Sequence, residues 1–206
     1  MDLNFPTASS LAIIDRKIEG IEENLAPAQY EIIRQVVYCT ADFEYASLVS
    51  FSNGALAKGA AALTALTPII VDVPEIQVNI VPRLQQAFGN PVYCCATINT
   101  QTGDKSTRAA AGLEIMGTKF PNSIFIIGQD QTAMSEMVNL LQNKIIEPSL
   151  AIATPPVFIE SDAKQRLKNS SVPSITLNSS KGGANVAAAI FNSLVKLAWQ
   201  ARQHGR

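Results

Sequence analysis

Short apolar runs alternate with segments of helical periodicity along this chain, and this alternation limits the fold more than any other feature. Apolar, β-branched runs typical of buried strands occupy residues 68–72, 91–95, 123–128, 149–153 and 174–177. Helical patterns occupy residues 52–64, 106–119, 131–144, 162–168 and 183–200. Strands that are apolar on both faces need cover on both sides. The sequence therefore predicts an α/β fold with a doubly wound, mostly parallel sheet and helices on both faces, in a flavodoxin-like three-layer arrangement.

Two amphipathic helices are expected before the first of these strands. One stripe at helical spacing is formed by Leu11, Ile14, Ile18 and Ile21. The hydroxyl of Ser9 or Ser10 is a candidate N-cap for that helix. A second helix is predicted from Pro27, a residue favoured in a first turn, to about residue 37. Because no repeat or linker interrupts the chain, residues 1–206 are expected to form a single domain.

Charge and cysteine content exclude several classes of partner. The formal net charge of −1 provides no basic field for nucleic acid, and no apolar run approaches the roughly 20 residues needed to cross a membrane. The three cysteines, Cys39, Cys94 and Cys95, show no CxxC spacing, and the one histidine is His204. These features favour a cytoplasmic protein whose reduced thiols are buried as small hydrophobic side chains, and no metal or other cofactor is expected.

The loops that follow parallel strands share one edge of a sheet, which is where ligands of such folds bind. We call the loops after residues 72, 95, 128, 153 and 177 the rim. At one helix start on the rim, Thr107 and Arg108 bring a hydroxyl, backbone N–H groups and a guanidinium together, an arrangement suited to a carboxylate or phosphate. Lys181, Gly182 and Gly183 form a similar arrangement. A capped helix with Arg108 in solvent, and a simple tight connection at the two glycines, are the alternatives.

Two further polar segments are candidates for the site. Gln129, Asp130 and Thr132 follow the most apolar strand and open a helix, where Asp130 is also well placed to act only as the N-cap. At the end of the second helix, the Tyr38 phenol can donate a hydrogen bond, although a half-buried aromatic with a satisfied hydroxyl is the alternative. The neighbouring Cys39 has no nearby histidine or lysine in the sequence to lower its pKa.

Several of these segments resemble one known family. Residues 38–44, Tyr-Cys-Thr-Ala-Asp-Phe-Glu, resemble His-Ala-Thr-Ala-Asp-Phe-Glu of the precorrin-8X methylmutases, and residues 107–111, Thr-Arg-Ala-Ala-Ala, resemble their Thr-Arg-Ser-Ala-Ala. Looser matches, in the same order as in the family, lie at residues 10–14, 128–134, 155–164 and 182–194. The resemblance extends over nearly the whole chain.

The resemblance implies an isomerase that moves a methyl group from C11 to C12 of precorrin-8X or cobalt-precorrin-8 in cobalamin biosynthesis, with no cofactor consumed. It also implies a homodimer. It places Tyr38 at the position of the catalytic acid and gives substrate contacts to Ser10 and Arg108. The remaining candidate substrate contacts are Thr40, Thr107, Gln129, Thr132, Lys181, Gly182 and Gly183.

The chain departs from the family pattern at the expected site. Tyr38 stands in place of the histidine, and Gln129-Asp130-Gln131 in place of Asn-Ala-Pro. Family glycines are replaced by Asn79, Val157 and Glu160. Two functions therefore stay open. One is a working methylmutase, and the other is a noncatalytic tetrapyrrole-binding relative that acts as a carrier or sequestering protein.

Overall fold

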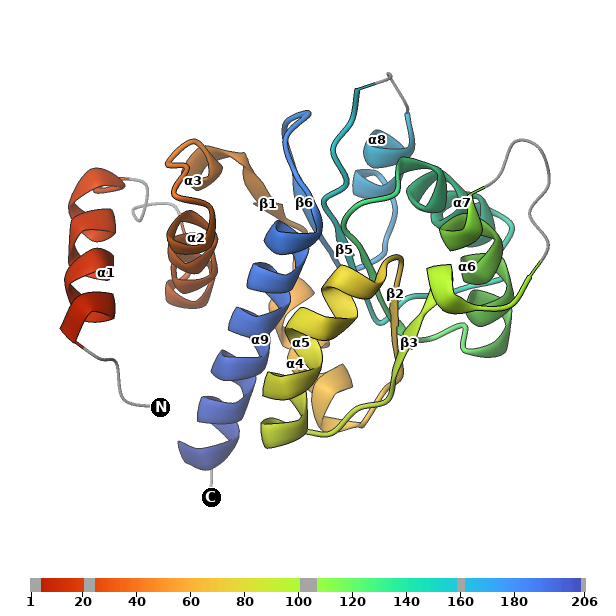
Figure 1. Cartoon of the computed structure of the whole chain (residues 1–206), viewed down its shortest axis with the longest axis horizontal. Coiled ribbons are helices and arrows are strands. Elements are labelled where there is room, and N and C mark those ends of the chain that lie inside the picture. The colour runs from red at the N-terminus through yellow and green to blue at the C-terminus, as the bar shows by residue number, and fades with distance from the viewer. Residues whose placement is uncertain (1–4, 21–24, 101–106, 159–161, 205–206) are drawn as a thin grey trace.

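A mixed six-stranded sheet forms the centre of the computed structural model, which describes residues 5–20, 25–100, 107–158 and 162–204 (Figure 1). The strand order is β1-β6-β5-β4-β2-β3. The strands are β1 (Val49–Phe51), β2 (Ile69–Val71), β3 (Val92–Cys94), β4 (Ile124–Ile127), β5 (Leu150–Ala153) and β6 (Ser174–Leu177). All neighbours are parallel except β1, which pairs antiparallel with β6. The five parallel strands follow the flavodoxin-like order, so the predicted fold class is confirmed.

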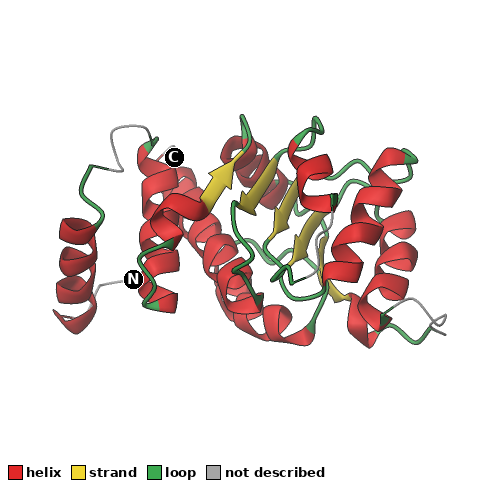
Figure 2. Cartoon of the chain, turned by 90° about the horizontal axis from the view of Figure 1, so that it is seen from above, coloured by secondary structure: helices red, strands yellow, loops and turns green. Residues whose placement is uncertain are grey.

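Helices cover both faces of the sheet, as Figure 2 shows from above. One face carries α4 (Ala55–Thr64), α5 (Pro74–Ala87) and α9 (Ala184–His204), and the other carries α6 (Arg108–Lys119), α7 (Gln131–Gln142) and α8 (Ala163–Lys168). Successive strand residues alternate between the two cores: Ile124 and Ile126 face the first group of helices, whereas Phe125 and Ile127 face the second. This alternation is why β2, β4 and β5 are apolar at every position.

Two further helices, α1 (Phe5–Lys17) and α2 (Pro27–Thr40), extend the first face outward (Figure 1). The α2 helix packs on α9, and α1 packs on α2. Both helices were predicted, and Leu11, Ile14 and Ile18 are buried as expected, while Ile21 lies outside the described residues. The predicted cap of α1 is wrong, because the helix begins at Phe5 and Ser9 and Ser10 lie inside it.

The structure also contains elements that the sequence patterns did not indicate. Helix α5 fills the stretch after β2 and buries Ile76, Ile80 and Leu84, although Pro82 interrupts its pattern. The short elements α3 (Tyr45–Leu48), β1 and the 3₁₀ turn η2 (Cys95–Thr97) span too few residues to produce a periodic signal. Helix α4 starts later than predicted, because Ser52 still pairs with Ser174 and the chain turns at Gly54, where φ is 75°.

None of the described helices is long and apolar enough to cross a membrane.

Helix α6 approaches the end of β3 so closely that only glycine fits at the contact. A Cβ atom on Gly112 would lie 2.1 Å from the carbonyl oxygen of Cys95, and backbone cannot move away as a flexible side chain can. The first residues of α6 are therefore held against the loop that follows β3.

The Gly112→Ala variant is expected to lower the free energy of unfolding by about 1–3 kcal/mol through this clash. Helix propensity alone predicts the opposite, a gain of about 1 kcal/mol. Urea unfolding measures the change, with Ala111→Gly as the matched control that should cost about 1 kcal/mol or less. Equal or greater stability of Gly112→Ala would contradict the close contact.

Candidate functional site

The carboxyl ends of the five parallel strands share one edge, as expected for the rim. Strand β2 is followed by α5 on one face of the sheet, whereas its neighbour β4 is followed by α7 on the other face. The chain therefore diverges between β2 and β4, and such a switch point is where ligands bind in doubly wound folds.

Asp72 ends β2 and organises this switch point. Its side chain is fully buried, and its carboxylate accepts hydrogen bonds from the backbone N–H groups of Gln129 and Asp130, both at 2.8 Å. It also accepts from Gly128 at 3.2 Å and from Val73 at 3.0 Å. Burial raises the pKa of Asp72, while the N–H donors oppose that shift. One carboxylate thus fixes the loop after β4 to the end of β2.

Sequence reasoning noted Asp72 only as a strand end. The available signal was an aspartate placed directly after a fully apolar strand, where an ionisable side chain is buried only if it has partners.

The β6–α9 connection lies beside the loop after β5. The N–H of Gly183 donates to the Thr154 carbonyl at 2.8 Å, and a Cβ on Gly182 would come within 2.0 Å of the same oxygen. Gly183 adopts φ +133°, and the Gln129 amide oxygen is 3.9 Å from its ideal Cβ position. The structure therefore brings three predicted residues, Gln129, Gly182 and Gly183, together at the middle of the rim.

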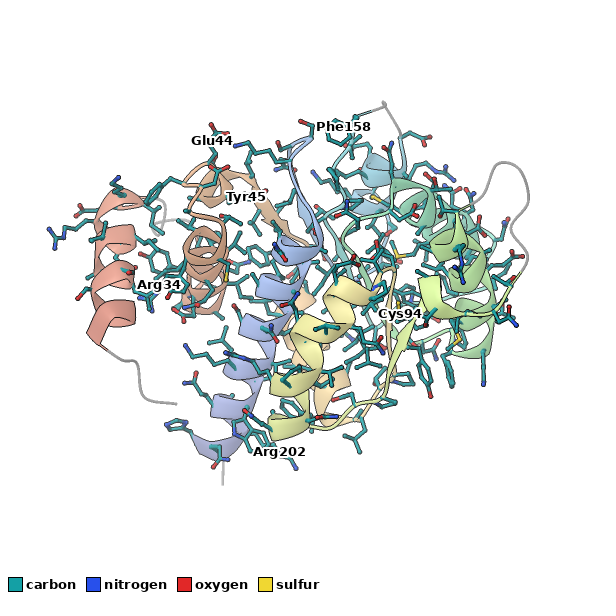
Figure 3. The ribbon with its side chains drawn as sticks, viewed as in Figure 1. Arg34, Glu44, Tyr45, Cys94, Phe158 and Arg202 are labelled. Carbon is teal, nitrogen blue, oxygen red and sulfur yellow. The ribbon has the colours of Figure 1, made fainter. Side chains whose placement is uncertain are left out.

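Lys181 joins this connection to the segment before α3. Its ammonium contacts the Asp42 carboxylate at 2.6 Å and the Glu44 carboxylate at 2.7 Å. The hydrogen bond to Asp42 is the largest cause that raises the pKa of Lys181, and Lys181 in turn lowers the pKa of Asp42. Figure 3 shows Glu44 and Tyr45 at the same end of the molecule as Phe158, from the loop after β5. The Lys181 charge is thus already matched by two carboxylates.

At the end of α2, the Tyr38 side chain is exposed, whereas the Thr40 hydroxyl is engaged in hydrogen bonds. Tyr38 is 41% exposed, so its phenol is open to solvent and ligand. The Thr40 hydroxyl donates to the Val36 carbonyl at 2.8 Å and accepts from the Asp42 N–H at 3.3 Å. Thr40 therefore uses its hydroxyl in ending the helix, next to Ala41 in the left-handed region at φ 54°.

Two predicted residues act as helix caps. The Thr107 hydroxyl accepts from the Ala110 N–H at 3.1 Å, and the Asp130 carboxylate accepts from the Ala133 N–H at 2.9 Å. The predicted cap role of Asp130 is confirmed. Arg108 follows Thr107 as the exposed first residue of α6, and none of the described residues forms an ion pair with it. Thr132 lies half-buried in the first turn of α7.

The candidate residues do not form one compact cluster within a single chain. Tyr38 lies on α2, which packs outside α9 on one face, and the chain continues from α2 into the edge strand β1. Arg108 begins α6 on the opposite face, after β3 at the other edge. Five strand spacings separate those edges, about 24 Å. Ser10 lies on α1, and Glu160 lies outside the described residues.

The cysteines divide into two groups. Cys94 and Cys95 are buried, as predicted, but Cys39 is exposed, so the expectation of burial is wrong for that residue. It lies near the end of α2 and is not part of the buried stripe that contains Val36 and Val37. Partial burial of its sulfur raises the pKa of Cys39, and Arg83 opposes this shift. Within the described part of the chain, no group of three potential ligands could hold a metal ion.

Fold and geometry together define a doubly wound α/β protein whose candidate ligand site lies at the switch point of its sheet. Residues 7–197 match the family model of precorrin-8X methylmutase. Cobalt-precorrin-8 methylmutase of Synechocystis sp. is 31% identical over 93% of this chain and 94% of its own length. The Methanocaldococcus jannaschii enzyme of the same name is 35% identical over 81% of this chain and 79% of its own length. The crystal structure of precorrin-8X methylmutase from Thermus thermophilus superposes with a TM-score of 0.86, at 27% identity over 96% of this chain and 99% of that one.

The chain belongs to the precorrin-8X methylmutase family, a family of isomerases that act in cobalamin biosynthesis. The family resemblance predicted from the sequence is confirmed.

The Asp72→Asn variant should lower the free energy of unfolding by about 3 kcal/mol, because an amide offers one acceptor and turns N–H donors toward the N–H groups of residues 128–130. Urea unfolding measures the loss. Asp162→Asn, at a side chain that is 75% exposed, is the matched control and should change stability by less than about 0.5 kcal/mol. A loss no larger than that of the control would rule out the anchoring role of Asp72.

Alkylation of Cys39 by iodoacetamide should follow an apparent pKa above the ordinary thiol value of about 8.5, because burial disfavours the thiolate. The rate is measured against pH on the native protein, and Cys39→Ser identifies the signal. Removing the nearby charge in Arg83→Gln should raise the apparent pKa further. An apparent pKa below that of an ordinary thiol would make Cys39 a credible nucleophile.

Proposed function

We propose that this chain moves a methyl group from C11 to C12 of precorrin-8X or cobalt-precorrin-8. The observation that carries the proposal is the family match over residues 7–197, which includes every candidate site residue. The reaction transfers a methyl group within one molecule, so it needs no second substrate. We further propose that residues 1–206 act as a single domain, and that the reaction takes place in the cytoplasm, where the free Cys94 and Cys95 would stay reduced.

A noncatalytic carrier role is the second candidate, because Tyr38 replaces the histidine of the family pattern. A phenol is a weaker proton donor near neutral pH than an imidazole. It can still donate a hydrogen bond to charge that develops on the macrocycle, and such a bond is useful when it strengthens in the transition state. The exposure of Tyr38 leaves its phenol available for that contact.

Substrate binding is assigned mainly to Arg108. The macrocycle carries carboxylate side chains, and Arg108 presents a guanidinium at a helix start with no ion-pair partner among the described residues. Lys181 is committed to two carboxylates, so we assign it to holding the Tyr38–Glu44 segment as well as to substrate contact. Phe158, which is 89% exposed on the rim, offers an apolar surface to the face of the macrocycle.

We also propose that the enzyme is a homodimer whose site takes residues from both copies. Tyr38 and Arg108 lie on opposite faces of one sheet and near opposite edges. A two-fold axis places the same surface of each copy opposite the other, so Tyr38 of one copy can face Arg108 of the next. Ser10 on the outer helix α1 would reach substrate in the same way.

Turnover is tested by anaerobic absorbance assay with enzymatically generated precorrin-8X and cobalt-precorrin-8. The unmodified protein should convert at least one of them, Tyr38→Phe should reduce kcat by about 100-fold, and Arg108→Gln should mainly raise KM. Lys119→Gln, an exposed charge at the other end of α6, is the control. Binding without turnover, with activity appearing only in Tyr38→His, would establish the carrier role.

Mixing the two impaired variants tests the shared site. Unfolded and refolded together in equal amounts, Tyr38→Phe and Arg108→Gln should recover about a quarter of full activity, because half the dimers are mixed and each has one intact site. No recovery, with mixed dimers shown to form, would place each site within one copy.

A further inference from the structure

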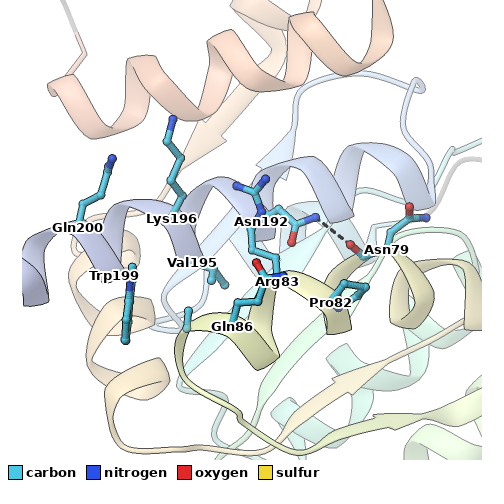
Figure 4. Close-up of a pocket in the computed structure, with 10 residues that line it drawn as sticks. Asn79, Pro82, Arg83, Gln86, Asn192, Val195, Lys196, Trp199 and Gln200 are labelled. Carbon is cyan, nitrogen blue, oxygen red and sulfur yellow. Dashed lines mark hydrogen bonds between the residues drawn. The ribbon is translucent and has the colours of Figure 1, made fainter. Parts of the chain in front are cut away.

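A groove of about 520 Å³ runs along α5 and α9, on the face that carries α2 (Figure 4). All of its lining residues belong to these two helices; Asn79 replaces a family glycine, and none of the lining residues is among the candidate substrate contacts. Volumes of about 300–1,000 Å³ are typical of sites for small organic ligands.

The charge of the groove is positive. Arg83 extends from α5 toward α9, where Lys196 also lines the groove, and no aspartate or glutamate does so (Figure 4). Glu31 binds the Lys196 ammonium at 3.0 Å. Among the described residues, none forms an ion pair or hydrogen bond with the half-buried Arg83. A guanidinium partly removed from water without a counter-charge favours an anion.

A second polar group of the groove also lacks a partner. The Asn192 amide donates to the Asn79 carbonyl at 3.0 Å, but its Oδ1 atom is buried and accepts no hydrogen bond from the described residues. Because this oxygen is enclosed by the protein, a molecule in the groove cannot reach it, so Asn192 contributes to the wall of the groove and not a hydrogen bond to a ligand.

Apolar side chains form much of the remaining wall of the groove, beside Gln86 and Gln200. Trp199 packs edge-on against Phe88, with ring centroids 5.5 Å apart, and Pro82 and Val195 lie along the same groove. An aromatic surface of this kind accommodates a planar apolar group.

We propose that this groove binds an organic acid that carries a flat apolar body. The carboxylate pairs with Arg83, and the apolar body lies against Trp199. The proposal does not depend on the methylmutase reaction.

Trp199 is the single tryptophan of the chain, so its fluorescence reports directly on the groove. The probe is hippurate, which combines a carboxylate, an amide N–H and a phenyl ring. Titration of the full chain should give a saturable change in emission. Hippuramide, which has the same shape without the charge, should bind at least about tenfold more weakly.

Arg83→Gln should weaken hippurate binding by about tenfold or more, while Arg16→Gln, which removes the same charge from an exposed position on α1, should not. A signal that does not saturate, or that is equal in Arg83→Gln and the unmodified protein, would overturn the proposal. Sedimentation of the same variants measures their oligomeric state. Dissociation of a dimer by Arg83→Gln alone would show that the groove is a contact between copies, which would also overturn the proposal.

Discussion

The arrangement of the rim depends on the carboxylate of Asp72. It is buried at the point where the chain diverges to opposite faces of the sheet, and it accepts hydrogen bonds from three consecutive N–H groups of the next parallel strand's loop. A carboxylate in this position is stable only while those donors surround it. The path of residues 128–130, and with it the position of Gln129 beside Gly183, therefore follows from one side chain.

Hydrophobic periodicity was sufficient to predict the layers of this fold. The strands β2, β4 and β5 are apolar at every position because both faces are covered, and this pattern is readable without a structure. Helix α5 was not predicted because Pro82 interrupts its pattern, and β1 was not predicted because three residues carry no period. The cap at Ser9 or Ser10 was wrong because a hydroxyl inside a helix has the same local sequence as one at its start.

The site could be predicted only in part, because sequence shows which groups are present but not which are already paired. Lys181 has the composition of an anion receptor, yet Asp42 and Glu44, about 140 residues earlier, neutralise its charge. The Thr40 hydroxyl is a candidate ligand contact by sequence, yet in the structure it forms hydrogen bonds with the backbone at the end of α2. Long-range pairing of this kind leaves no local pattern. The Arg108 guanidinium remains available for an anion, as its sequence context indicated, because no acidic side chain among the described residues pairs with it.

The separation of Tyr38 from Arg108 also bears on how much the reaction loses when Tyr38 replaces the family histidine. If one chain held the whole site, a tyrosine at the catalytic position would have to act alone on a substrate held from the same side. In the proposed homodimer, the partner's rim can supply the carboxylate contacts and exclude water, so the phenol needs to provide only one oriented hydrogen bond. The energetic demand on that position is then smaller than the change from imidazole to phenol suggests. The helices α1 and α2, which carry Ser10 and Tyr38 outside the main three layers, are placed to make such a contact.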